Sequence, residues 1–224
     1  MNARSRTEIK LISLPLTKYQ EVWDLQHSIF ERLTGGEDCD TLILCQHPPV
    51  YTLGRVTEQT NILFTDAELE KIGAEKFEIE RGGDVTFHGP GQLVGYPLLN
   101  LSHFKEDLGW YLRALEETII LTLSYFQVEG YRIAGRTGVW VRSSVGEEKI
   151  CSIGIKASRW CTMHGFAFNV NTDLSYFDHI IACGIGDRKM TSLSKSLGKE
   201  MLFSEVETQY MRAFEEVFEC SLTT

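Results

Sequence analysis

Apolar residues recur along the chain at two different spacings, and the longer spacing marks the helices. Between Thr17 and Leu33 they recur three and four residues apart, which predicts an amphipathic helix that Thr17 caps and Gly35–Gly36 ends. Asp107 is expected to cap the longest helix, over about 108–126. Its apolar residues are dense enough to predict burial on more than one side.

Two further helices are predicted from capping boxes, in which a Ser or Thr is followed three residues later by Glu. The first box, Thr-Asp-Ala-Glu at 65–68, predicts a short helix that ends near Ile72. The second, Ser-Glu-Val-Glu at 204–207, predicts a helix that ends near Phe218.

Shorter segments alternate apolar and polar residues or are apolar throughout, which predicts strands. These segments are 41–45, 50–53, 76–80, 85–88, 93–101, 139–142, 149–155 and 164–170. The polar turn at 143–148 predicts a hairpin between 139–142 and 149–155. Short connections favour a mixed, largely antiparallel sheet flanked by helices, an α+β fold that forms one domain over residues 1–224.

Glycines are densest between Arg81 and Pro97, in the stretch RGGDVTFHGPGQLVGYP. Such glycines let the backbone approach a ligand or another strand closely. The alternative is a glycine-cornered hairpin within a sheet. No G-x-x-x-x-G-K-[ST] pattern is present, so the stretch is not a phosphate-binding loop.

Composition narrows the class of protein. The chain has 224 residues, of which 43% are hydrophobic, so we expect a packed core. A net charge of −9 argues against broad binding to nucleic acid or an anionic membrane. No signal-peptide segment and no membrane-length apolar run occurs, which predicts a cytoplasmic protein, and we expect a monomer. The six cysteines lack the spacing of a zinc site, so no metal is expected. We expect the thiols to be reduced.

Three motifs occur in a fixed order: the glycine-rich stretch, then KICSIG at 149–154 and HGFAFNVN at 164–171, then Ala-Cys-Gly at 182–184. Together they resemble the signature of the lipoyl(octanoyl) transferases. The resemblance implies the fold of biotin and lipoate protein ligases. It also implies transfer of an octanoyl group from acyl carrier protein to a lysine of lipoyl domains, those of 2-oxoacid dehydrogenases and the glycine cleavage H protein. No cofactor is expected, because a thioester is already activated.

The resemblance assigns the nucleophile to Cys183 and its partner to Lys149. A thiolate attacks thioesters well, and a desolvated lysine has a lowered pKa and accepts protons. From the residues alone, the favoured interpretation of Cys183 is a buried cysteine in an apolar turn, and that of Lys149 is an exposed turn residue. Lys156 is a rival for Lys149. Regular strand alternation would point Lys149 and Lys156 to opposite faces, so that only one faces the pocket, and Lys156 with Arg159 is placed at the rim.

The motif residues are expected to bind substrate. They are Arg81, Gly82, Gly83, Asp84, Val85, Thr86, Phe87, His88, Ser152, Ile153, Gly154, His164, Gly165, Phe166 and Ala167. His88 and His164 are interpreted as hydrogen-bonding residues, with acid–base catalysis as the alternative. Docking of an acidic carrier protein to this acidic chain is expected to need a local basic patch. The candidates for it are Arg55, Arg81, Arg142, Lys156 and Arg159.

Two other functions remain open at this point. An ATP-dependent lipoate or biotin protein ligase has the same fold, but no match to the ligases' nucleotide-binding motif is found. A non-catalytic module that binds an acyl group or a carrier protein would keep the pocket and need no reactive thiol.

Overall fold

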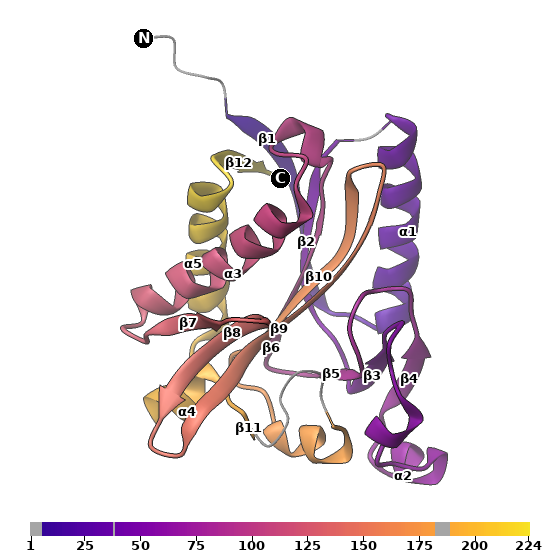
Figure 1. Ribbon diagram of the computed structural model, residues 1–224, viewed down its shortest axis with the longest axis vertical. Coiled ribbons are helices and arrows are strands. Elements are labelled where there is room, and N and C mark those ends of the chain that lie inside the picture. Colours follow the sequence, from indigo (N-terminus) through magenta and orange to yellow (C-terminus); the bar gives the residue numbers. More distant parts are fainter. Residues whose placement is uncertain (1–5, 38, 182–188) are drawn as a thin grey trace.

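A mixed β-sheet runs the length of the molecule, with helices on both faces (Figure 1). The computed structural model describes residues 6–37, 39–181 and 189–224. The strand order is β12 (Cys220–Thr223), β1 (Thr7–Leu16), β2 (Thr41–Gln46), β6 (Gln92–Leu98), β10 (Cys161–Asn169), β9 (Gly146–Ser158), β8 (Arg136–Ser143) and β7 (Gly130–Ile133). β1 is parallel to both of its neighbours, and the pairs from β2 to β7 are antiparallel. β11 (Lys189–Met190) adds a short parallel pairing to β9. The predicted α+β class is confirmed.

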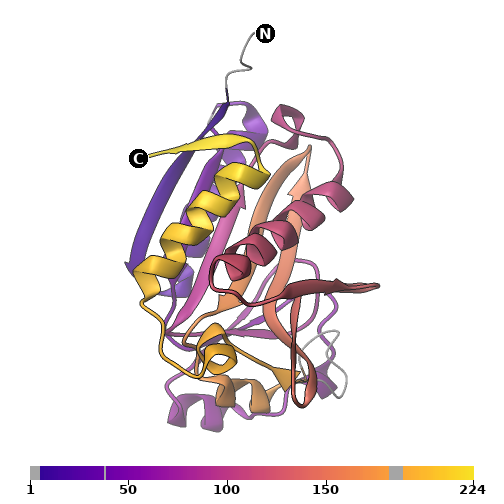
Figure 2. The same cartoon turned by 90° about the vertical axis from the view of Figure 1, so that its left-hand side faces the viewer.

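Three long helices cover the sheet. α3 (Leu108–Tyr125) and α5 (Phe203–Val217) lie on the same face (Figure 2), where the largest core cluster forms around Tyr111, Phe168 and Tyr210. α1 (Tyr19–Gly35) covers the other face with its residues at positions 22, 29, 30 and 33. Among the described residues, no helix combines the length and the apolar character needed to cross a membrane.

The N-terminal helix begins one residue later than predicted. Its N-cap is Lys18, which makes no side-chain capping bond. Thr17 is still tied to β2 through its backbone N–H, which donates to Gln46 O at 2.9 Å, and its hydroxyl donates to Pro15 O. The predicted end is correct: Gly36 takes the left-handed conformation, with φ 78°, and its N–H reaches back to the last turn.

Caps made by local side chains explain two of the other helices. α2 (Asp66–Lys71) has both hydrogen bonds of the predicted capping box, and Asp107 caps α3 by accepting from Trp110 N at 2.9 Å. The second predicted box is wrong, because α5 starts after Leu202 and Ser204 already lies in its first turn. Phe203 packs against the core and moves the helix start upstream. α4 (Leu193–Leu197) was not predicted.

A second, three-stranded sheet lies at the lower right in Figure 1. Its order is β4 (Glu75–Glu78), β3 (Val50–Leu53) and β5 (Thr86–His88), all predicted within two residues. Short 3₁₀ turns at η1 (Gln59–Asn61) and η3 (Leu174–His179) close over it. In the large sheet, β9 is longer than predicted, and β1, β7, β11 and β12 were missed.

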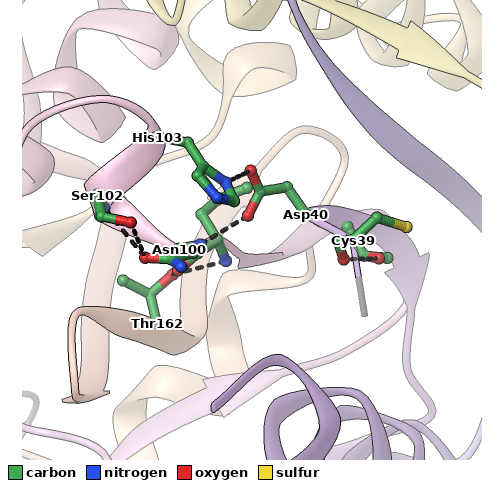
Figure 3. A network of polar contacts seen from close by, with 8 residues as sticks. Cys39, Asp40, Asn100, Ser102, His103 and Thr162 are labelled. Carbon is green, nitrogen blue, oxygen red and sulfur yellow. Dashed lines mark hydrogen bonds and ion pairs between the residues drawn. The ribbon is translucent and has the colours of Figure 1, made fainter. Parts of the chain in front are cut away.

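A polar network joins the start of β2 to η2 (Leu101–His103) after β6 (Figure 3). The buried Asp40 carboxylate accepts from His103 Nδ1 at 2.7 Å and from Asn100 N at 2.6 Å. Its backbone carbonyl accepts from Lys10 N at 2.9 Å. These residues do not line the cavity described below, so the network fixes the fold at the opposite end of β2.

Candidate functional site

A cavity of about 350 Å³ lies where the loop after β4 packs on β9 and β10. This volume is in the range of small-molecule sites, about 300–1,000 Å³. All but one of the predicted site residues that the structure describes line it. They are Arg81, Gly82, Gly83, Asp84, Val85, Thr86, His88, Lys149, Ser152, Ile153, Gly154, His164, Gly165, Phe166 and Ala167. Motifs separated by more than 60 positions therefore form one wall.

The glycine-rich loop sits directly on β9. Gly82 N donates to Ile155 O at 2.9 Å, so the loop continues the hydrogen bonding of the strand edge. A β-carbon at Gly154 would lie 2.8 Å from Gly82 O, which shows that only glycine fits there without moving the loop. Arg81 anchors the other side of the loop. Its Nη2 donates to Thr52 O at 2.6 Å and to Thr52 Oγ1 at 3.0 Å.

Phe87 does not line the cavity, which corrects the prediction. The strand alternation of β5 turns Thr86 and His88 toward the cavity and Phe87 away from it. Its ring stacks on Tyr176 with centroids 4.5 Å apart and contacts Tyr51 and Phe177 in the core of the smaller sheet. Phe87 therefore supports the wall from behind.

His88 is a buried, neutral residue of the cavity wall. Burial, with the neighbouring His47 as the next cause, lowers the pKa of His88 to about 3. Nδ1 lies 2.9 Å from Gln92 Oε1, and the ring stacks on Tyr19. An imidazole that is neutral at pH 7 is available for hydrogen bonds, and the hydrogen-bonding role of His88 stays a prediction.

His164 adopts a left-handed backbone conformation, with φ 60°, inside β10. Its N–H donates to Gln26 Oε1 at 3.1 Å, and its Nε2 lies 3.8 Å from Glu80 Oε2. Burial lowers the pKa of His164, although the Glu80 carboxylate opposes that shift. His164 and a hydrogen bond from Lys156 Nζ hold the pKa of Glu80 well below its usual range despite some burial. An anchored carboxylate therefore lies behind His164.

Lys149 is buried, with 6% of its surface exposed, and lines the cavity. Its Nζ lies 5.6 Å from the centre of the Trp140 ring, within the range of a cation–π contact. A lysine in the cavity wall is placed to exchange protons with a bound ligand.

The strand-face argument that separated Lys149 from Lys156 is wrong. The β8–β9 register shifts between Val139, which pairs with Cys151, and Trp140, which pairs with Lys149. Ile150 is therefore an extra residue, a β-bulge, and the alternation changes phase there. Both lysines consequently lie on one face of the sheet by register. They are distinguished by position along β9, since only Lys149 lines the cavity.

Neither Lys156 nor Arg159 lines the cavity, and the candidates for the basic patch lie in different segments of the chain, so a basic docking patch stays a prediction. Lys156 bonds Glu80 at 3.0 Å and covers the Phe30 ring of α1. Arg159 lies in the tight turn between β9 and β10. Arg81 is buried under the loop, and Arg142 lies over the Tyr131 ring near β7. Arg136, which was not predicted, lines the cavity as Arg81 does.

Cys183 lies outside the described residues. The described chain stops at Ile181, whose N–H donates to Asn61 O, and resumes at Lys189, which pairs with Glu148 beside Lys149. Among the described cysteines, Cys151 is nearest to Lys149 in sequence, but burial raises its pKa and it belongs to the core under α3 and α5. Cys151 is therefore unsuited to be the nucleophile.

Several further cavity residues were missed, and all of them except Tyr96 come from outside the motifs. They are Tyr19, Ile79, Tyr96, Leu112, Gly135, Arg136, Thr137 and Ile155. Tyr19 and Leu112 belong to the buried faces of predicted helices, so their pattern predicts a core position and carries no sign of a ligand. Arg136 follows a turn glycine, and no local signal distinguishes it from a solvated charge.

These features define the class of protein: an α+β fold whose two central strands and glycine-rich loop form a small-molecule cavity with a lysine in its wall. The family described as the lipoyl protein ligase A/B catalytic domain matches residues 18–215. An octanoyltransferase from Christiangramia forsetii is 44% identical over 230 residues, covering 96% of this chain and 97% of that protein. The chain therefore belongs to the lipoyl protein ligase A/B catalytic domain family.

Solved structures share the fold at low identity. A bipartite lipoate protein ligase from Thermoplasma acidophilum, studied with its E2 lipoyl domain, has a TM-score of 0.71 at 16% identity, covering 99% of this chain and 88% of that chain. The biotin protein ligase of Aquifex aeolicus has a TM-score of 0.51 at 18% identity, covering 94% and 69%. The expected likeness to biotin and lipoate ligases is thus confirmed for the fold.

Proposed function

We propose that this protein transfers an octanoyl group from the thioester of an acyl carrier protein to a lysine amine of a lipoyl domain. The observation that carries the proposal is the cavity itself, because the glycine-rich stretch, KICSIG and HGFAFNVN all contribute to its wall around Lys149. The similarity to octanoyltransferases over nearly the whole chain supports the same reaction.

In the proposed mechanism, the thiolate of Cys183 attacks the thioester carbonyl of octanoyl carrier protein. The carbon–sulfur bond to the phosphopantetheine arm breaks, and its thiol leaves with a proton while the octanoyl group remains on Cys183. The acceptor lysine amine then attacks this second thioester and forms the amide as the Cys183 thiolate leaves. Lys149 accepts the proton from the thiol in the first half and from the incoming amine in the second.

The cavity supplies binding energy for the acyl chain. Aliphatic and aromatic groups such as Ile153, Phe166 and Leu112 line it beside the glycine backbone. Each buried CH₂ contributes about 0.8 kcal/mol, so a chain that reaches these walls is held by several kcal/mol. Binding of this kind places the carbonyl beside Lys149 and raises the effective concentration of the reacting groups.

The proposed partners follow from the reaction. The donor is octanoyl carrier protein, and the acceptors are lipoyl domains of 2-oxoacid dehydrogenases and the glycine cleavage H protein. We place the protein in the cytoplasm as a monomeric, single-domain enzyme that needs neither metal nor nucleotide.

The test is intact mass after incubation with octanoyl carrier protein, followed by addition of a lipoyl domain. We expect the wild-type protein to gain one octanoyl group and to pass it on. Cys183→Ala should gain none, because it lacks the nucleophile. Cys151→Ala is the matched control: it removes the thiol of KICSIG, which lies in the core, and it should still gain the group.

Other outcomes identify the alternatives. If Cys151→Ala gains no octanoyl group and Cys183→Ala still does, the assignment of Cys183 as the nucleophile is overturned. A lipoyl domain modified by free octanoate only when ATP is added would indicate a ligase. Tight binding of the donor with no gain in mass would indicate a non-catalytic carrier-binding module.

A further inference from the structure

Two buried carboxamides lie behind the cavity wall, and no step of the proposed mechanism uses them. Gln92 begins β6 and Asn169 ends β10, and the two are direct partners in the sheet. Their exposed fractions are 1% and 0%, and neither lines the cavity. Buried amides are costly unless every donor and acceptor is paired. The hydrogen-bond partners of these two residues fix the orientation of each amide group.

Backbone carbonyls only accept hydrogen bonds, so the amide nitrogen must be the group that faces each of them. Asn169 Nδ2 donates to Thr191 O at 3.0 Å, so Asn169 Oδ1 must face Gln92. Gln92 Nε2 donates to that oxygen at 2.9 Å and to Phe87 O at 3.1 Å. Two independent carbonyls therefore require the same orientation of the amides, with Gln92 Oε1 facing the other way.

Gln92 Oε1 faces His88 Nδ1 at 2.9 Å. Because this oxygen only accepts, Nδ1 must carry the proton. On the other side of the ring, Nε2 lies 3.4 Å from Thr52 Oγ1. Thr52 Oγ1 already accepts from Arg81 Nη2 at 3.0 Å, which leaves its hydroxyl hydrogen for the lone pair of Nε2. Both sides of the ring thus favour one tautomer of a neutral imidazole.

The far end of the chain of hydrogen bonds reaches Lys149. Thr191, whose carbonyl accepts from Asn169, donates its own N–H to Lys149 O at 2.9 Å. Met190, the preceding residue, is the strand partner of Lys149. Side-chain and backbone bonds therefore run from His88 in one wall of the cavity to Lys149 in the other.

We infer that Gln92 and Asn169 are positioning residues that hold His88 as the Nδ1–H tautomer and hold the Thr191 segment against Lys149. The part of this inference that concerns acyl transfer rests on the proposed function. Neither residue touches the reacting atoms. Each acts through a residue of the cavity wall, so that His88 and Lys149 keep one relative placement during transfer.

The test compares Asn169→Leu with Asn171→Leu. Asn171 is two residues further along and makes an equivalent pair of bonds, to Met201 O at 2.8 Å and from Met201 N at 3.0 Å, but has no link to His88. Long-range ¹H–¹⁵N spectra of histidine-labelled protein report the tautomer, and His88→Asn assigns the signal. We expect the Nδ1–H form in the wild type and in Asn171→Leu, and a mixture of tautomers in Asn169→Leu.

Kinetics supply the second readout. We expect Asn169→Leu to lower kcat about tenfold or more with KM for the donor within about twofold, because small displacements of reacting groups cost up to about 100-fold. Asn171→Leu should lower thermal stability and leave kcat within about twofold. An Nε2–H or doubly protonated His88 in the wild type would overturn the inference. So would Asn169→Leu with an unchanged tautomer and kcat.

A further variant covers the case in which Asn169→Leu does not fold. Gln92→Met keeps the length of the side chain but removes the oxygen that faces His88 Nδ1, so we expect a mixture of tautomers and a lower kcat. An unchanged Nδ1–H tautomer in this variant would overturn the inference. The spectra need no substrate, so a wild-type protein without transfer activity would count against the proposed function alone, and the tautomer would still decide the inference.

Discussion

Gly154→Ala tests how closely the loop at 81–83 must pack on β9. A β-carbon at residue 154 would lie 2.8 Å from Gly82 O and 3.0 Å from Arg81 Cδ. Ordinary contacts begin at 3.4 Å, so the loop has to retreat by about 0.6 Å from a densely packed neighbour. The retreat lengthens the hydrogen bond from Gly82 N to Ile155 O, now 2.9 Å, and displaces one wall of the cavity.

The expected magnitude combines two opposed terms. Overpacking of this kind costs about 1–3 kcal/mol. Replacing Gly by Ala at an unstrained backbone position stabilises by about 0.4–1 kcal/mol. The free energy of unfolding should therefore fall by about 1–2 kcal/mol, and Tm by about 2–8 °C for a chain of this size. Because the displaced loop shapes the acyl site, kcat/KM should fall about 10- to 100-fold.

The assay is transfer from octanoyl carrier protein to a lipoyl domain, followed by mass, together with thermal unfolding. Gly35→Ala is the control, because the atoms nearest to a β-carbon there are 3.9 Å away and belong to the flexible Glu37 side chain. It should leave kcat/KM unchanged. Wild-type stability and activity in Gly154→Ala would refute the close-packing argument. Lower stability with wild-type kcat/KM would refute the link between the loop and the acyl site.

Two further predictions concern the cavity and its surroundings. Lys149→Ala should lower kcat more than tenfold, because loss of a general base typically costs about 10²–10⁴. Lys156→Ala should mainly lower stability, because it removes the bond to Glu80. Transfer kinetics of both variants test this, and a loss of kcat in Lys156→Ala without one in Lys149→Ala would refute it. Burial lowers the pKa of His47 to about 4, so the unfolded chain binds a proton below about pH 6.5 that the folded protein does not. The contribution of this group to the free energy of unfolding should be full above that pH and fall between pH 6.5 and 5.5 by at most about 1.4 kcal/mol per pH unit. Urea unfolding at several pH values should show a smaller dependence of the free energy of unfolding on pH in His47→Gln than in the wild type. An equal slope in both proteins would exclude the contribution of His47.

Features determined by neighbours in sequence were predictable. The capping box of α2 and the Asp107 cap need only residues within three positions, and both form as predicted. Gly36 is similar, because a left-handed helix end needs a glycine and little else. Phe87 also carried its own signal: alternation along 86–88 already turns it away from its two neighbours.

Features determined by distant pairing were not predictable. The bulge at Ile150 arises from the register of β9 against β8, and nothing in KICSIG marks it. The capping pattern at Ser204 does not set the start of α5, because Phe203 packs against the core and already belongs to the helix. Tyr19, Tyr96 and Arg136 reach the cavity only because their elements pack around it. The motif residues were found because the resemblance already groups them.

The parallel pairing of β12 with β1 has a consequence for biosynthesis. Thr7 pairs with Cys220, so almost the entire chain separates two strands that lie side by side. On a ribosome, β1 is made early and one of its two neighbours very late. Until β12 arrives, one edge of β1 offers unsatisfied N–H and C=O groups to any passing strand. Completion of the sheet is therefore a late event of high contact order, and it is the stage of synthesis at which the nascent protein is most exposed to misassembly.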